Sequence, residues 1–168
     1  MKTAPILLAA LSVLAGCAQN PQNAEEFRQY IPRATFGAKQ TYEVERPWQE
    51  VAKTFQARAP ECLNVSVRTV ESGGGSYSNV LATYKPTVVV GASRAELHLQ
   101  RKLKGNVIVP GKEPEGGNYM LVADATPVGR GRTRIDVYAP SLGADTLVKT
   151  INGWASGKNL GCPDMTKH

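Results

Sequence analysis

Apolar side chains recur with helical spacing in two stretches, one on each side of a strand-rich middle. The first stripe consists of Trp48, Val51, Ala52, Phe55 and Ala59. The second consists of Ala144, Leu147, Val148, Ile151 and Trp154. Pro47 suits the first helical position and Pro60 predicts the end of the first helix, while Gly157 predicts the end of the second. The pattern therefore predicts two amphipathic helices with one apolar face each.

Between these helices, and just before the first, polar and apolar residues alternate with the period of two that half-buried strands show. The expected strands cover residues 40–45, 65–72, 78–90, 95–100, 107–109, 119–125 and 133–138. Because the middle strands follow one another without intervening helices, the sheet should be mostly antiparallel. We therefore expect an α+β fold, in which a two-layer domain has a mostly antiparallel β-sheet and both helices packed on one face.

The N-terminal apolar run, residues 4–14, is far shorter than the ~20 residues that span a bilayer. It follows Lys2 and leads into Leu14-Ala15-Gly16-Cys17, a sequence that resembles the lipobox of bacterial lipoproteins. The resemblance implies cleavage before Cys17 and attachment of diacylglycerol and an N-acyl chain, such as palmitate, to that cysteine. No aspartate follows Cys17, which in this family favours the outer membrane. The alternative is an ordinary signal peptide with a chance cysteine.

The leader divides the chain into three parts. Residues 1–16 form the expected signal peptide, and residues 17–39 a lipidated flexible tether, because Gln, Asn and Pro dominate its start and no steady apolar period follows, apart from a candidate helical turn at 25–30. Residues 40–168 form a single α+β domain, a length that suits one ordinary domain.

Two cysteines remain once Cys17 is set aside. Cys62 and Cys162 form an even pair in an oxidising compartment, where a disulfide is the expected state. Each follows a predicted helix closely, so a bridge would hold the two helices side by side. Two free thiols or a catalytic cysteine are the alternatives, and the sequence offers no partner histidine motif for catalysis.

Residues 43–63 lead from a strand into a helix that begins with Pro47 and Trp48 and continues with Val51 and Phe55. This stretch resembles the helix-grip modules of envelope-assembly lipoproteins. The resemblance implies a small two-layer module that accompanies an assembly machine, and it identifies no functional residue.

Charge is uneven along a chain with a net charge of +6. Residues 94–134 contain eight Lys or Arg against four acids. Within them, Arg130, Arg132 and Arg134 would form a ladder with ~6.6 Å spacing on one strand face. Such a ladder could bind an anionic envelope partner, because guanidinium groups recognise phosphate and carboxylate. The alternative is that acids on neighbouring strands neutralise it; nucleic acid is not expected as a partner of an exported protein.

Candidate catalytic residues are few. Ser93 lies in a near match to the nucleophile elbow, but strand alternation follows it where a helix is required, so we expect a turn. His98 has no metal-ligand spacing around it and is expected to be an ordinary exposed histidine. The sequence therefore predicts no catalytic residue, no metal site and no cofactor.

Three functions remain open. The first is a non-catalytic binding or assembly module, anchored to the outer membrane through Cys17 and facing the periplasm. The second is a protein that binds a small or lipidic ligand between helices and sheet. The third is an envelope hydrolase, for which we find no clustered nucleophile and base.

Overall fold

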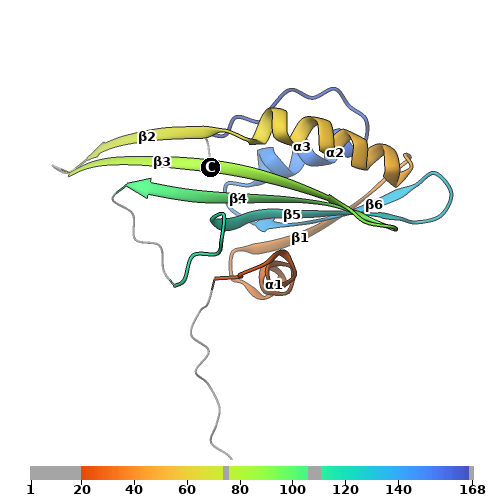
Figure 1. The fold of residues 1–168 in the computed structure, drawn as a ribbon, viewed down its shortest axis with the longest axis horizontal. Coiled ribbons are helices and arrows are strands. Elements are labelled where there is room, and N and C mark those ends of the chain that lie inside the picture. Colours follow the sequence, from red (N-terminus) through yellow and green to blue (C-terminus); the bar gives the residue numbers. More distant parts are fainter. Residues whose placement is uncertain (1–19, 74–75, 106–110, 167–168) are drawn as a thin grey trace, which may run out of the picture.

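The computed structural model describes residues 20–73, 76–105 and 111–166, and the side chains of residues 69–78 are not described. The chain forms an α+β fold built on one antiparallel six-stranded sheet (Figure 1). The spatial order is β1 (Gly37–Val44), β6 (Thr133–Pro140), β5 (Asn118–Pro127), β4 (Ala95–Gly105), β3 (Ser76–Val90) and β2 (Ser66–Gly73). The lipobox and the expected strand at 107–109 lie outside the described residues.

Two helices, α2 (Trp48–Leu63) and α3 (Asp145–Ala155), pack over one face of the sheet, which we call the inner face (Figure 1). Their apolar stripes are buried except for the partly buried Trp48, and Phe55 and Ile151 are fully inaccessible to solvent. The sheet contributes inward-facing side chains from β4, β5 and β6 to the same core, namely Leu97, Leu99, Leu121, Ala123, Ile135 and Val137. Burial of each such Leu or Ile stabilises the fold by about 1.5–3 kcal/mol.

Helix α2 continues past Pro60, the residue at which the sequence predicted its end. Proline lacks an N–H, which weakens the helix locally. Cys62 and Leu63 are nevertheless 2 % and 0 % exposed in its last turn, and their burial offsets that loss. Cys62 therefore lies inside the helix rather than beyond it.

A third helix overturns the expected flexible tether at 17–39 and the domain start at 40. Helix α1 (Ala24–Tyr30) and a short 3-10 turn, η1 (Ile31–Arg33), pack on the opposite, outer face of the sheet (Figure 1). Phe27 and Ile31 are each 3 % exposed and pack with Val122 of β5. The folded domain thus has helices on both faces, and from Asn23 onward the expected tether is folded.

Arg28 attaches α1 to the sheet. Glu96 of β4 and Asp124 of β5 are direct cross-strand partners. Arg28 donates to both oxygens of Asp124, with Nε–Oδ2 2.8 Å and Nη2–Oδ1 2.7 Å, and it also donates to Glu96. All three side chains are only 10–12 % exposed. Because two neighbouring carboxylates repel each other, this charge-assisted contact is what allows them to be buried together.

Burial opposes ionisation of Glu96, but hydrogen bonds from His98 and Arg28 outweigh it and lower the pKa of this carboxyl group. For Arg28, burial also opposes the charge, but Asp124 and Glu96 raise the pKa of the guanidinium further above its ordinary value. Glu96 and Arg28 are therefore both charged at neutral pH.

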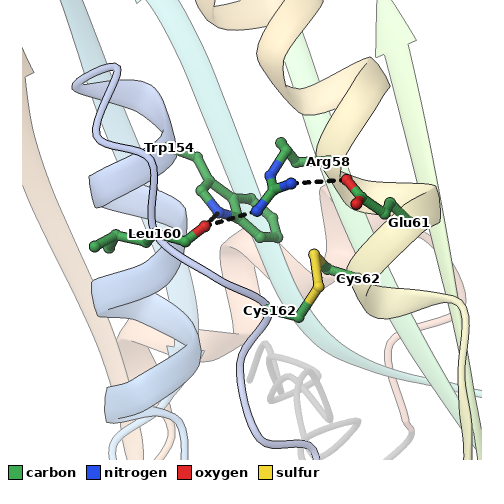
Figure 2. Close-up of a disulfide and its surroundings, with 6 residues drawn as sticks. All are labelled: Arg58, Glu61, Cys62, Trp154, Leu160 and Cys162. Atoms are coloured by element: carbon green, nitrogen blue, oxygen red, sulfur yellow. Dashed lines mark hydrogen bonds and ion pairs between the residues drawn. A yellow bond between two sulfur atoms is a disulfide. The ribbon is translucent and has the colours of Figure 1, made fainter.

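The disulfide joins Cys62 of α2 to Cys162 in the C-terminal segment, with an S–S distance of 2.02 Å, as the cysteine count predicted (Figure 2). Beside it, Arg58 donates to the carbonyl oxygen of Leu160 at 2.7 Å and lies over the ring of Trp154 at 5.7 Å (Figure 2). Trp154 Nε1 donates to the same carbonyl at 3.3 Å. The bridge thus holds the C-terminal segment, rather than the end of α3 itself, against α2.

We predict that Arg28→Ala lowers the free energy of unfolding by about 3 kcal/mol at neutral pH, because it removes the cation beside the buried Asp124 and leaves Glu96 with the half-exposed Arg94 as its cation. The folded-state pKa of Glu96 lies below its unfolded value. Its stabilisation is therefore complete above the unfolded pKa and is lost as the pH falls through the folded pKa. Urea unfolding at neutral and acidic pH should show the deficit of the variant shrinking in acid.

Arg33→Ala is the matched control, because Arg33 lies exposed in η1. It should change the stability by no more than about 0.5 kcal/mol. Equal deficits in the two variants, or a deficit of Arg28→Ala that does not depend on pH, would contradict the proposed role of Arg28.

We further predict that the double variant Cys62→Ser/Cys162→Ser unfolds with a free energy about 2–5 kcal/mol lower than that of the oxidised protein. The bridge closes a loop with a sequence separation of 100, which strongly restricts the unfolded chain. Hydrogen exchange should also accelerate in residues 156–166. Unchanged urea midpoints and unchanged exchange in that segment would argue against a stabilising bridge.

Candidate functional site

A cavity of about 250 Å³ lies on the inner face, between the sheet and the N-terminal end of α3. Strands β3 to β6, the loop before α3, α3 itself and the C-terminal segment all contribute to it. Its lining consists of Tyr84, Leu99, Arg101, Met120, Pro140, Leu142, Gly143, Ala144, Leu147 and Met165. The cavity is close in size to the lower end of small-molecule sites, ~300–1,000 Å³.

A β-bulge turns one strand residue into the cavity. Leu99 pairs with Leu121, whereas the next residue, Gln100, pairs with Tyr119, so Met120 is the extra residue of β5. Met120 and Leu121 therefore both join the inner core, while Tyr119 packs on the outer face with α1. Bulges of this kind re-aim side chains next to binding sites.

Arg101 is the one charged side chain in this apolar lining. Its Nε is fully buried, and among the described residues no acceptor lies within hydrogen-bonding distance of it. Nor does the described part of the chain pair Arg101 with any carboxylate. A buried N–H donor without an acceptor is costly, and an anionic group in the cavity that accepts from Nε would remove that cost.

The cavity opens beside Leu142, which is 68 % exposed, whereas Tyr84 at its inner wall is 2 % exposed. Met120 and Met165 also line it, and the unbranched, flexible methionine side chain adapts to differently shaped apolar ligands. Neither Trp48 nor Trp154 lines the cavity; Trp154 is 1 % exposed in the core.

The predicted arginine ladder does not form. Strand β6 begins at Thr133, so Arg130 and Arg132 lie in the turn before it, and only Arg134 belongs to the strand. Glycines on both sides of Arg130 adopt positive φ angles, 97° at Gly129 and 74° at Gly131, which bends the chain away from strand geometry.

Two of these arginines also have acidic partners, as the alternative interpretation expected. Arg132 contacts Glu43 at 3.1 Å, and Arg134 contacts Asp136 at 3.2 Å. Both contacts are about half exposed on the arginine side, so they still leave charge accessible to solvent.

The outer face carries a row of three acids, because Asp136 of β6 is the cross-strand partner of Asp124. Burial opposes the charge of Asp136, but hydrogen bonds from Thr41 and Lys39 outweigh it and lower the pKa of this carboxyl group. Lys39 lies 3.2 Å from it. Each acid of the row therefore has a cation beside it, and the row offers a structural network rather than an available base.

Two residues weighed in the sequence take ordinary positions. Ser93 lies in the bend between β3 and β4. His98 was expected to be exposed, but its side chain is only 14 % exposed, because Nε2 lies 2.9 Å from Glu96 and the ring meets Tyr119 edge-on at 6.2 Å. Cys17 lies outside the described residues.

Among the described residues, no group of three or more His, Cys, Asp or Glu side chains could hold a metal ion. No helix of that part of the chain is both long and apolar enough to cross a bilayer.

Comparisons with known proteins assign this chain to no family. The sequence matches no protein-family model and no curated protein. Among solved structures, the chain is similar to the crystal structure of the hypothetical protein jhp0584 from Helicobacter pylori, with a TM-score of 0.36 and 11 % sequence identity. The alignment covers 92 % of this chain and 96 % of that one.

Proposed function

We propose that this chain is a lipid-anchored envelope protein whose domain binds an amphipathic molecule with an anionic head group in the cavity on the inner face. The observation that carries the proposal is the buried Nε of Arg101, to which the described residues offer no acceptor, in a lining that is otherwise mostly apolar. The proposed activity is binding, not catalysis.

The chemistry of the lining defines the ligand class. Arg101 would hold a carboxylate or phosphate group through charge-assisted hydrogen bonds. Leu99, Met120 and Leu147 would surround an apolar chain. A volume of about 250 Å³ suits a single short acyl chain, or the end of a longer one, rather than a whole diacyl lipid.

The lipobox supports an envelope location for such a ligand. Attachment at Cys17 would place the domain at a membrane, outer and periplasm-facing by the family resemblance, where acyl compounds are abundant. A docking module was the first interpretation of the sequence, but its anion-binding surface depended on the ladder that Arg130, Arg132 and Arg134 do not form. The cavity therefore favours the ligand-binding alternative.

We predict that octanoate binds the protein and that Arg101→Gln lowers its affinity about ten-fold or more, because a hydrogen bond to a charged group contributes ~1.5–3 kcal/mol. Octanol, which has the same chain and no charge, should lose much less affinity. Titration calorimetry of the wild type and the variant with both ligands measures the difference directly.

Lys102→Gln is the matched control, since it removes the same charge at the exposed neighbouring position of β4. It should leave the affinity for octanoate unchanged. Equal losses in the two variants would reduce the role of Arg101 to a general charge effect. No saturable binding of either ligand to the wild type would reject the cavity as an acyl site.

A separate experiment tests the lipid anchor at Cys17. Mass spectrometry of the N-terminal peptide from the protein expressed in a bacterial host should show a chain that begins at acylated Cys17. Cys17→Ser should release the protein into the soluble fraction. Ser12→Ala, which lies in the leader but leaves Leu14-Ala15-Gly16-Cys17 intact, should not. An unmodified N-terminal peptide in the wild type would exclude lipidation.

A further inference from the structure

Three large exposed apolar side chains lie at one end of the sheet. Phe36 and Leu142 are 63 % and 68 % exposed, and Tyr30 is 48 % exposed. Gly37 at the start of β1 pairs with Pro140 at the end of β6, and Ser141 N donates to Phe36 O at 2.7 Å. These contacts bring the segments that carry Phe36 and Leu142 together, although the residues are far apart in sequence.

The N-terminal segment reaches the same end. A groove on this part of the surface is lined by Asn20 and Pro21 together with Tyr30, Phe36 and Pro140. Gln22 Nε2 also donates to the carbonyl oxygen of Lys112 at 3.1 Å, which fixes the segment against the rest of the domain. The described chain thus begins beside the exposed apolar residues.

Chain length then limits where a lipid on Cys17 can lie. Asn20 is the third residue after Cys17, and a fully extended chain spans at most ~3.6 Å per residue. The Cα atom of Cys17 is therefore within about 11 Å of that of Asn20. Because Arg28 fixes α1 to the sheet, this short connection would keep the domain close to a bilayer that holds a lipid on Cys17.

We propose that the end of the domain formed by Tyr30, Phe36, Pro140 and Leu142 rests on the surface of the bilayer that holds the Cys17 lipid. This inference rests on the lipid anchor of the proposed function. Phe36 and Leu142 enter the interfacial region, and Tyr30 keeps its hydroxyl group among the head groups, as aromatic residues at membrane interfaces do.

The orientation also places the mouth of the cavity at the membrane. Leu142 and Pro140 belong both to this end of the domain and to the cavity lining. An acyl compound could therefore move between the bilayer and the site near Arg101 without crossing water. A partner protein or a second copy of the chain is the competing occupant of the same apolar surface.

The experiment uses the lipidated full chain, reconstituted into vesicles of phosphatidylethanolamine and phosphatidylglycerol. Single Phe36→Cys and Leu142→Cys variants carry a nitroxide label, and the native bridge keeps Cys62 and Cys162 from reacting. Val90→Cys is the matched control, because Val90 is a 43 % exposed apolar residue at the far end of β3. Power-saturation spectroscopy then compares collisions with apolar oxygen and with a water-soluble nickel complex.

Labels at 36 and 142 should collide more with oxygen and less with nickel than the label at 90. Equal nickel access at all three positions would overturn the proposed orientation. Labels at 36 and 142 that are shielded from both reagents, with immobile spectra that persist in detergent, would instead show a protein occupant and also overturn it.

These outcomes are separable from failure of the proposed function. Flotation with the vesicles reports the anchor itself, and a chain that does not float overturns the orientation together with the anchor. Octanoate binding in detergent reports the cavity, and it should be the same for Phe36→Cys and the wild type. If the protein does not bind octanoate but the labels at 36 and 142 still collide more with oxygen and less with nickel, the ligand site is rejected and the orientation stands.

Discussion

The buried contact between Arg28, Glu96 and Asp124 determines how the rest of the molecule is arranged. Strand pairing places the two carboxylates side by side on the outer face, where they would repel each other. The cation that neutralises them comes from α1, outside the sheet. A sheet with only α2 and α3 would lack the cation beside Asp124, and Glu96 would keep Arg94 at 2.7 Å as its cation, so burial of the two carboxylates together depends on the N-terminal helix. The apolar contacts of Phe27 and Ile31 then fix the orientation of the helix.

Packing of α1 on the sheet shortens the part of the N-terminal region that could act as a flexible linker. A flexible segment from 17 to 39 would let the domain sample many heights and orientations above a membrane. Only two residues, Ala18 and Gln19, lie between the candidate lipidation site and the start of the described chain at Asn20. The same helix therefore has two effects. It provides the cation beside Glu96 and Asp124, and it brings Phe36 and the N-terminal segment, with the proposed lipid anchor, to one end of the domain.

The parts of the fold that the sequence predicted are those with long periodic patterns. Helices α2 and α3, the antiparallel strands and the Cys62–Cys162 pair all follow from spacing or count. Helix α1 was predicted only as a candidate helical turn at 25–30, because the buried stripe of α1 and η1 has only Ala24, Phe27 and Ile31, too few to predict a packed helix. The predicted arginine ladder was wrong because the alternation of strand residues was extended across Gly131 into a turn. The bulge at Met120 breaks the period of two and could not be read from the pattern.

Arg101 shows how a site residue can be visible in a sequence and still be overlooked. Ala95, Leu97 and Leu99 occupy the inward positions of β4, and Arg101 is the next position in that alternation. A charge at an inward position requires a partner, and other arginines of this domain have one: Arg58 donates to Leu160 and Arg46 to the carbonyl oxygens of Trp154 and Ala155. The described residues offer none to Nε of Arg101. Since a structural arginine would be expected to bind a backbone carbonyl in the same way, the unmet donor beside an apolar cavity favours an external anion as its partner.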